Sequence, residues 1–193
     1  MSDVAAVPMA SSRGRVAPFV ALAAAAVLGG LFWLLAGSNN VSTDTASSFL
    51  IGKPAPAVVT TELDGGTFDL SRRKGSWVVL NFFNSTCVPC KAEHADLVAF
   101  AEQQTTFAGG AELYTVINDD SDSAVRAWFD ERGGDWPIIK DDNGSIAVAF
   151  GVAKVPETWV IDPSGVVQAR YAGPTTAEAL GTLLQQLRLS QGE

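Results

Sequence analysis

The two cysteines of the chain, Cys87 and Cys90, lie three positions apart in the run NSTCVPCKAEH, residues 84–94. Two thiols at this spacing can form a structural disulfide, supply part of a metal site, or carry electrons by opening and closing a disulfide. A structural disulfide here would close a very small loop and remove little entropy from the unfolded chain, so it would stabilise the fold only weakly. The elements that position the two sulfurs therefore help to decide between these roles.

A strand and a helix flank the two cysteines. The run WVVLNFF, residues 77–83, is nearly continuous in apolar and β-prone residues, which predicts a central strand covered on both faces. Residues 88–104 have apolar side chains at helical spacing. We therefore expect Cys87 at a helix N-terminus, where unpaired backbone N–H groups and the helix dipole favour a thiolate. Cys87 is the predicted attacking sulfur, and Cys90, one turn deeper, is predicted to resolve the mixed disulfide.

Strands and helices alternate through the rest of this region. After the first helix the pattern predicts a strand, a helix, a short strand with a brief helix, and two strands joined by a Pro-Ser-Gly turn, in residues 111–119, 121–134, 136–151 and 157–172. The segment LDGGT, residues 63–67, predicts a hairpin turn between two edge strands. A closing amphipathic helix follows, with Thr175 and Glu178 spaced as a capping box. The result is an α/β fold with helices on a mixed sheet.

A proline lies directly before the first of the last two strands. In the segment KVPET, Pro156 enters an apolar strand from a loop, which makes the Val155–Pro156 peptide bond a candidate for the cis form. The alternative is an ordinary trans proline at a strand edge.

These motifs together carry a family resemblance. The run VVLNFFNSTCVPCKAEH, followed about 60 residues later by GVAKVPETWVIDPSG and preceded by IGKPAP, resembles the thioredoxin superfamily. Within it, the chain is most similar to the membrane-tethered TlpA/ResA and CcmG/DsbE-like thiol-disulfide oxidoreductases. The resemblance covers residues 49–190 and implies a thioredoxin fold there. It also implies a cis Pro156, whose loop faces the disulfide and helps to hold an extended substrate segment.

Two acidic residues match positions that matter in that family. The resemblance puts Glu93 and Glu157 near the sulfurs, where a poorly hydrated carboxyl group would have a raised pKa and could exchange protons with Cys90. Solvated carboxylates are the alternative for both. Asn81 stands where thioredoxin has a buried acid, so proton handling must come from elsewhere. The chain departs from its relatives at Thr86, where they usually carry tryptophan.

An apolar segment precedes the globular part. Residues 16–36 form a run of 21 residues without a charge, preceded by Arg13 and Arg15. This length is enough to cross a bilayer as a helix, and the arginines favour a cytoplasmic N-terminal segment, residues 1–15. A cleaved signal peptide is the competing interpretation. Residues 37–48, rich in Ser, Thr and Asn, are predicted to be a flexible tether that leaves the thioredoxin-like domain outside the cytoplasm.

The resemblance implies a task in the reduction of disulfides outside the membrane. The implied substrates are the haem-attachment cysteines of apocytochrome c or other extracytoplasmic thiol proteins, with electrons from a membrane donor of the CcdA/DsbD type. An oxidant for protein folding remains possible, because the direction of electron flow depends on a reduction potential that sequence does not reveal. The formal net charge of −8 disfavours a nucleic-acid partner.

The sequence gives weaker support to three further functions. A peroxiredoxin normally has threonine three residues before its active cysteine, whereas this chain has Asn84. A copper-delivery module spaces its cysteines more widely and adds a distant histidine. His94, with the two thiols, gives too few ligands for zinc, which usually takes four, or three and a water. We predict neither a metal nor a cofactor.

Overall fold

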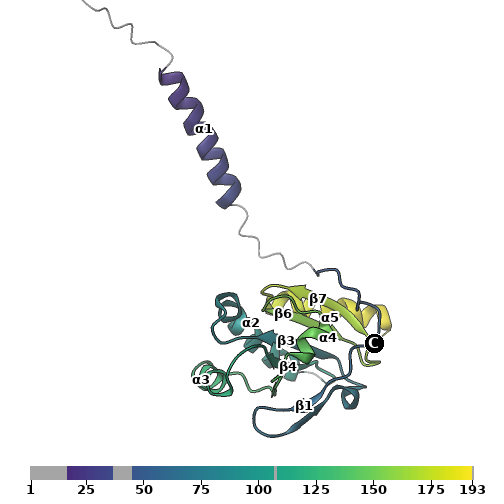
Figure 1. Ribbon diagram of the computed structural model, residues 1–193. Helices are drawn as coiled ribbons and strands as arrows, with labels where there is room; N and C mark the ends of the chain where they lie inside the picture. Colours follow the sequence, from purple (N-terminus) through teal and green to yellow (C-terminus); the bar gives the residue numbers. More distant parts are fainter. Residues whose placement is uncertain (1–16, 37–44, 107, 193) are drawn as a thin grey trace, which may run out of the picture. The chain divides into compact units, whose positions relative to one another are not determined.

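The computed structural model describes residues 17–36, which belong to a first unit, and residues 45–106 and 108–192, which belong to a second. The main sheet of the second unit consists of β3 (Val78–Phe83), β4 (Glu112–Ile117), β5 (Ile138–Ile139), β6 (Glu157–Ile161) and β7 (Val167–Ala172). Its strand order is β5-β4-β3-β6-β7, and Figure 1 labels β4, β3, β6 and β7. Strands β3, β4 and β5 are parallel, whereas β6 is antiparallel to both β3 and β7. The predicted mixed sheet is therefore confirmed, with β3 at its centre.

Helices cover both faces of this sheet. They are α2 (Val88–Thr105), α3 (Asp122–Arg132), α4 (Ser145–Phe150) and α5 (Ala177–Gln191). Val79 and Phe83 of β3 pack with apolar residues of α2, α3 and α5 on one face. Leu80 and Phe82 pack on the other face, in a second cluster that includes α4. All six residues of β3 are buried, as its continuous apolar run predicts.

The LDGGT segment forms the predicted hairpin. It joins β1 (Val59–Thr61) to β2 (Thr67–Asp69), and these two strands form a small antiparallel sheet of their own. A short 3₁₀ helix, η1 (Leu70–Arg73), follows. The hairpin is therefore not a strand pair of the main sheet, but it packs against that sheet through a bridge between Glu62 and Ile139 and a ring contact between Phe68 and Tyr114.

The predicted capping box of the last helix is wrong by one residue. Helix α5 is capped by Thr176, whose side chain accepts a hydrogen bond from the backbone N–H of Ala179 (3.1 Å). The backbone N–H of Thr175 instead donates to Glu93 (2.9 Å). Thr175, which the local spacing predicts as the cap, is instead bonded to the distant helix α2.

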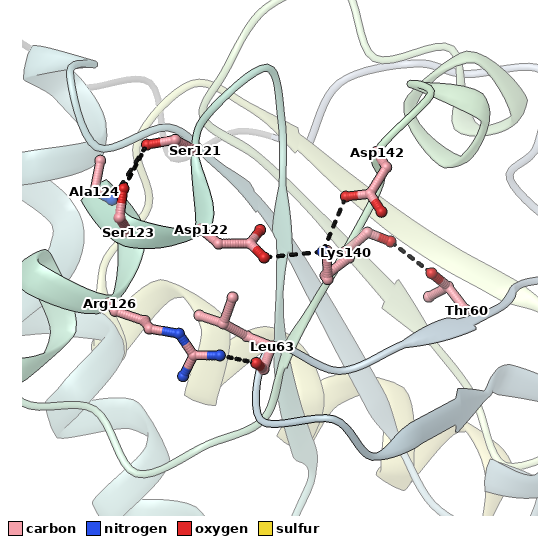
Figure 2. Close-up of polar contacts among 9 residues, drawn as sticks. All are labelled: Thr60, Leu63, Ser121, Asp122, Ser123, Ala124, Arg126, Lys140 and Asp142. Carbon is pink, nitrogen blue, oxygen red and sulfur yellow. Dashed lines mark hydrogen bonds and ion pairs between the residues drawn. The ribbon is translucent and has the colours of Figure 1, made fainter.

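The first turn of α3 is fixed to neighbouring elements, as Figure 2 shows. Ser121 caps the helix, and Asp122 forms an ion pair with Lys140 (2.9 Å), directly after β5. Farther along α3, Arg126 donates to the backbone carbonyl of Leu63 in the hairpin turn. The loop between β4 and α3 thus ends at a helix that is bonded to the segment after β5 and to the hairpin turn.

The first unit contains helix α1 (Ala17–Ala36). No helix in the described part of the chain meets the length and hydropathy that a membrane crossing requires. The predicted N-terminal segment, residues 1–15, and residues 37–44 of the predicted tether lie outside the described residues.

Candidate active site

The two cysteines lie at the start of α2, as predicted. Cys87 is the N-cap residue, and its Sγ accepts a hydrogen bond from the backbone N–H of Cys90 (3.2 Å). The two residues form a disulfide, with their Cα atoms 5.3 Å apart. Cys87 is half-buried, whereas Cys90 is 1% exposed. A substrate can therefore reach Cys87 more easily, and the N–H of Cys90 is placed to stabilise a Cys87 thiolate.

The loop before β6 faces the disulfide. The Val155–Pro156 peptide bond is cis, as the family resemblance implies. The carbonyl oxygen of Val155 lies 3.5 Å from Sγ of Cys87. This places Pro156 beside the more accessible sulfur, where its loop borders any segment that reaches Cys87.

Glu93 is buried one turn beyond Cys90 on α2. It is 2% exposed, and its two carboxyl oxygens accept hydrogen bonds from Nδ2 of Asn81 (2.8 Å) and from the backbone N–H of Thr175 (2.9 Å). Burial raises the pKa of Glu93 to about 7, and the two hydrogen bonds oppose that rise only in part. Cys90 and Glu93 are three residues apart and both buried, so they share one side of the helix. Glu93 is therefore a carboxyl group that can gain or lose a proton near neutral pH.

Asn81 links the buried carboxyl group of Glu93 to β6, the neighbouring strand of the sheet. Besides Glu93, its Nδ2 donates to Oγ1 of Thr158 on β6 (3.0 Å). Its Oδ1 is buried and has no hydrogen-bond partner among the described residues. A carbonyl oxygen with a free lone pair can accept a hydrogen bond from a protonated carboxyl group. Sequence reasoning noted Asn81 only as the replacement of an acid, and it missed Thr158 and Thr175 because their contacts join distant segments.

The structure places Glu157 away from Cys90, contrary to expectation. In the strand register Glu157 is opposite Phe82, whose side chain lies on the α4 face, whereas Cys90 packs on the α2 face. Successive side chains of a strand point to opposite faces, so Glu157 is turned away although Pro156 adjoins the sulfurs. Glu157 forms a buried ion pair with Arg170 and accepts from the backbone N–H of Ala153 (3.1 Å). Its contacts stabilise the loop before Pro156.

Changing Glu157 to Gln is expected to lower the free energy of unfolding by about 2 kcal/mol, because it removes the charge partner of a largely buried guanidinium. Urea denaturation of the oxidised chain measures this. Glu131→Gln is the matched control, since Glu131 and Arg132 form an exposed pair, for which a change below about 0.5 kcal/mol is expected. Equal effects of the two substitutions would contradict the assigned role of Glu157.

His94 is part of the core between α2 and α3. Its Nε2 lies 2.9 Å from the carbonyl oxygen of Gly133, and its Nδ1 is 3.4 Å from the indole nitrogen of Trp128. Burial is the main reason why the pKa of His94 is lowered. Both ring nitrogens therefore make polar contacts inside the core. Within the described ranges, no three His, Cys, Asp or Glu side chains are grouped so that they could hold a metal ion.

Comparison with known proteins gives this site a family. The model of the AhpC/TSA family matches residues 51–170. The thiol-disulfide oxidoreductase ResA of Bacillus thuringiensis is 31% identical over 137 residues, which cover 71% of this chain and 78% of that protein. A thiol:disulfide interchange protein DsbE homologue of Paracoccus denitrificans is 34% identical over 139 residues, covering 70% and 73%.

A solved structure shows the same fold. The thioredoxin domain of a thiol-disulfide oxidoreductase from Bacteroides vulgatus matches with a TM-score of 0.64 at 21% identity, covering 72% of this chain and 99% of that one. The predicted thioredoxin fold of the globular region is thereby confirmed. With its paired cysteines at the start of α2, the chain belongs to the AhpC/TSA family of thioredoxin-like proteins and is a thiol-disulfide oxidoreductase of the ResA and DsbE type.

Proposed function

We propose that the protein reduces disulfides of extracytoplasmic proteins, above all the haem-attachment cysteines of apocytochrome c. The observation that carries this proposal is the contrast between a half-buried Cys87 at the start of α2 and a buried Cys90 that shares its side of the helix with Glu93. One sulfur can meet a protein substrate, while the other and its proton acceptor stay protected from it. The resemblance to CcmG/DsbE-like proteins supports apocytochrome c as the substrate.

The proposed reaction transfers two electrons and two protons from the dithiol to the substrate. The Cys87 thiolate attacks one sulfur of the substrate disulfide, forming a mixed disulfide and releasing the other substrate sulfur as a thiolate, which takes up a proton. Cys90 then gives its proton to Glu93 and attacks Cys87. The second substrate thiol leaves with a proton, and Cys87 and Cys90 are joined in a disulfide. A membrane thiol reductant of the CcdA/DsbD type is the proposed source of the electrons that open this disulfide again.

Although no helix in the described part of the chain meets the requirements of a membrane crossing, residues 16–36 are the proposed membrane anchor on the strength of their sequence, with the catalytic domain on the extracytoplasmic side. Their support is the run of 21 uncharged residues with Arg13 and Arg15 before it. Because the N–H of Ala46 and the carbonyl oxygen of Ser47 are hydrogen-bonded to Arg170 of the domain, a tether of residues 37–44, fully extended, would reach at most about 29 Å from the membrane. We expect the full-length chain to float with vesicles. We also expect protease added from outside intact cells to cleave its C-terminal part. Protection from that protease would contradict the orientation.

The reduction potential tests the direction of electron flow. The full-length chain in detergent would be equilibrated with glutathione buffers, and its reduced form would be mixed with an oxidised peptide containing CxxCH. A potential near about −270 mV and rapid reduction of the peptide are expected of a reductase. A potential near about −120 mV would instead identify an oxidant for protein folding. Tight stoichiometric copper binding by the reduced chain, with inert disulfide exchange, would favour a copper-delivery module.

A further inference from the structure

Asn84 lies directly after β3 and uses every hydrogen-bonding position of its side-chain amide. Its Nδ2 donates to the backbone carbonyls of Asn118 (3.0 Å) and Asp119 (2.8 Å). Its Oδ1 accepts from the backbone N–H (2.8 Å) and the hydroxyl (2.6 Å) of Thr86. One side chain therefore joins the turn before Cys87 to the loop that follows β4.

Backbone groups complete the same junction. The carbonyl oxygen of Asn84 accepts from the N–H of Cys87 (3.1 Å), which closes a turn of four residues ending at the attacking sulfur. Within that turn, the N–H of Ser85 donates to a carboxylate oxygen of Asp120 (2.5 Å). The short connection between β3 and α2 is thus held from within and from the neighbouring loop.

The neighbouring loop is itself well anchored. At its start, the N–H of Asn118 donates to the carbonyl of Phe83 (2.9 Å), and at its end Ser121 caps α3 (Figure 2). Asp119, whose carbonyl accepts from Asn84, has a φ of 49°, a left-handed conformation that aspartate adopts more readily than most residues. Asn84 therefore binds to a loop whose two ends are fixed.

Thr86, the residue directly before Cys87, is part of this junction. Its side chain is exposed, and its hydroxyl is committed to Asn84. The residue before the first cysteine is therefore part of a hydrogen-bonded turn.

We propose that Asn84 is a positioning residue for thiol-disulfide exchange. It fixes the turn that delivers Cys87 to the start of α2, where the N–H of Cys90 reaches its sulfur (3.2 Å). Without Asn84 the turn is free to move, the hydrogen bond to the thiolate weakens, and Cys87 becomes a weaker acid and a slower nucleophile at neutral pH. This role is the same for every disulfide that Cys87 attacks and for both directions of electron flow.

The test is the reactivity of Cys87 in the full-length, reduced chain carrying Asn84→Ala. Alkylation of Cys87 by iodoacetamide would be followed from pH 5 to pH 10. The midpoint of its pH profile is expected to be about one unit higher, which makes alkylation about tenfold slower at pH values below both midpoints. Thr86→Val removes one of the four hydrogen bonds and is expected to move the midpoint in the same direction by less. Asn143→Ala is the matched control, because Asn143 also accepts from a backbone N–H (Ser145, 3.1 Å) but in an exposed turn elsewhere. Asn143→Ala should leave the alkylation profile of Cys87 unchanged.

A wild-type alkylation profile in Asn84→Ala would overturn the proposal. If the unfolding temperature of that variant were lowered while its alkylation profile stayed unchanged, Asn84 would be only a structural residue. If Asn84→Ala does not fold, Thr86→Val provides the test, since it alters an exposed side chain. An unchanged midpoint of the alkylation profile in Thr86→Val would then contradict the positioning role of Asn84.

Discussion

Replacing Cys87 by serine is expected to abolish disulfide reduction, lowering turnover by several orders of magnitude, as loss of a nucleophile does in other enzymes. A serine hydroxyl is not ionised at neutral pH and cannot form a disulfide, so the first step of the exchange is lost. Turnover of an oxidised CxxCH peptide by the full-length chain in detergent measures the effect. The structure assigns this step to Cys87 because it is the more exposed sulfur and receives the N–H of Cys90.

Cys90→Ser separates the two steps of the same reaction. This variant keeps the attacking sulfur and the backbone N–H that stabilises it, but has no thiol to resolve the mixed disulfide. It is expected to accumulate a covalent adduct with the substrate peptide, visible as an added mass and released by a reducing agent. Sustained turnover in Cys87→Ser, or an adduct on Cys90 in that variant at the wild-type rate, would reverse the assignment of the two cysteines.

The strand and helix around the cysteines could be predicted because their signals are local. The apolar run of β3 identifies a strand buried on both faces, and the following helical spacing makes Cys87 a residue of a helix start. The cap of α5 could not be assigned in the same way. Thr175 and Thr176 are adjacent and chemically equivalent, and only the contact of Thr175 with Glu93 decides which of them caps the helix.

The prediction that Glu157 lies near the sulfurs is wrong for a different reason. Its neighbour Pro156 does lie beside the disulfide, and proximity in sequence suggested the same for the carboxyl group. The direction of a strand side chain depends on the register with the next strand, which is a tertiary property. Asn84 was undervalued for a similar reason, because its side chain bonds to residues 34 and 35 positions away.

The buried carboxyl group of Glu93 makes stability depend on pH. Its pKa is raised from 4.5 to about 7, so between these values the folded chain holds a proton that the unfolded chain has lost. The free energy of unfolding therefore falls as the pH rises through this interval, by about 3 kcal/mol for this group alone. His94, whose pKa is lowered, contributes the opposite slope, so the wild type must be compared with a variant at each pH.

Glu93→Gln is expected to remove this contribution. Urea denaturation of the oxidised chain at pH 4.5 and pH 8 should show that the wild type loses about 3 kcal/mol relative to Glu93→Gln between the two conditions. Glu102→Gln, an exposed substitution on the same helix, is the matched control and should follow the wild type. Parallel pH dependences in wild type and Glu93→Gln would show that the carboxyl group does not titrate in this range.

The same substitution is expected to slow the second step of the exchange and leave the first unchanged. Glu93 and Cys90 share one side of α2, so the carboxylate is placed to take the proton as Cys90 attacks the mixed disulfide. Losing such a base costs about 10²-fold in rate, and the inflection near pH 7 in the wild-type resolution rate should disappear with it. Rapid-quench measurements of mixed-disulfide formation and decay separate the two steps. Because a glutamine retains the size of the buried side chain, a slower decay with normal formation identifies proton transfer as the lost property, whereas an equal slowing of both steps would mean that Glu93 only supports the fold around the cysteines.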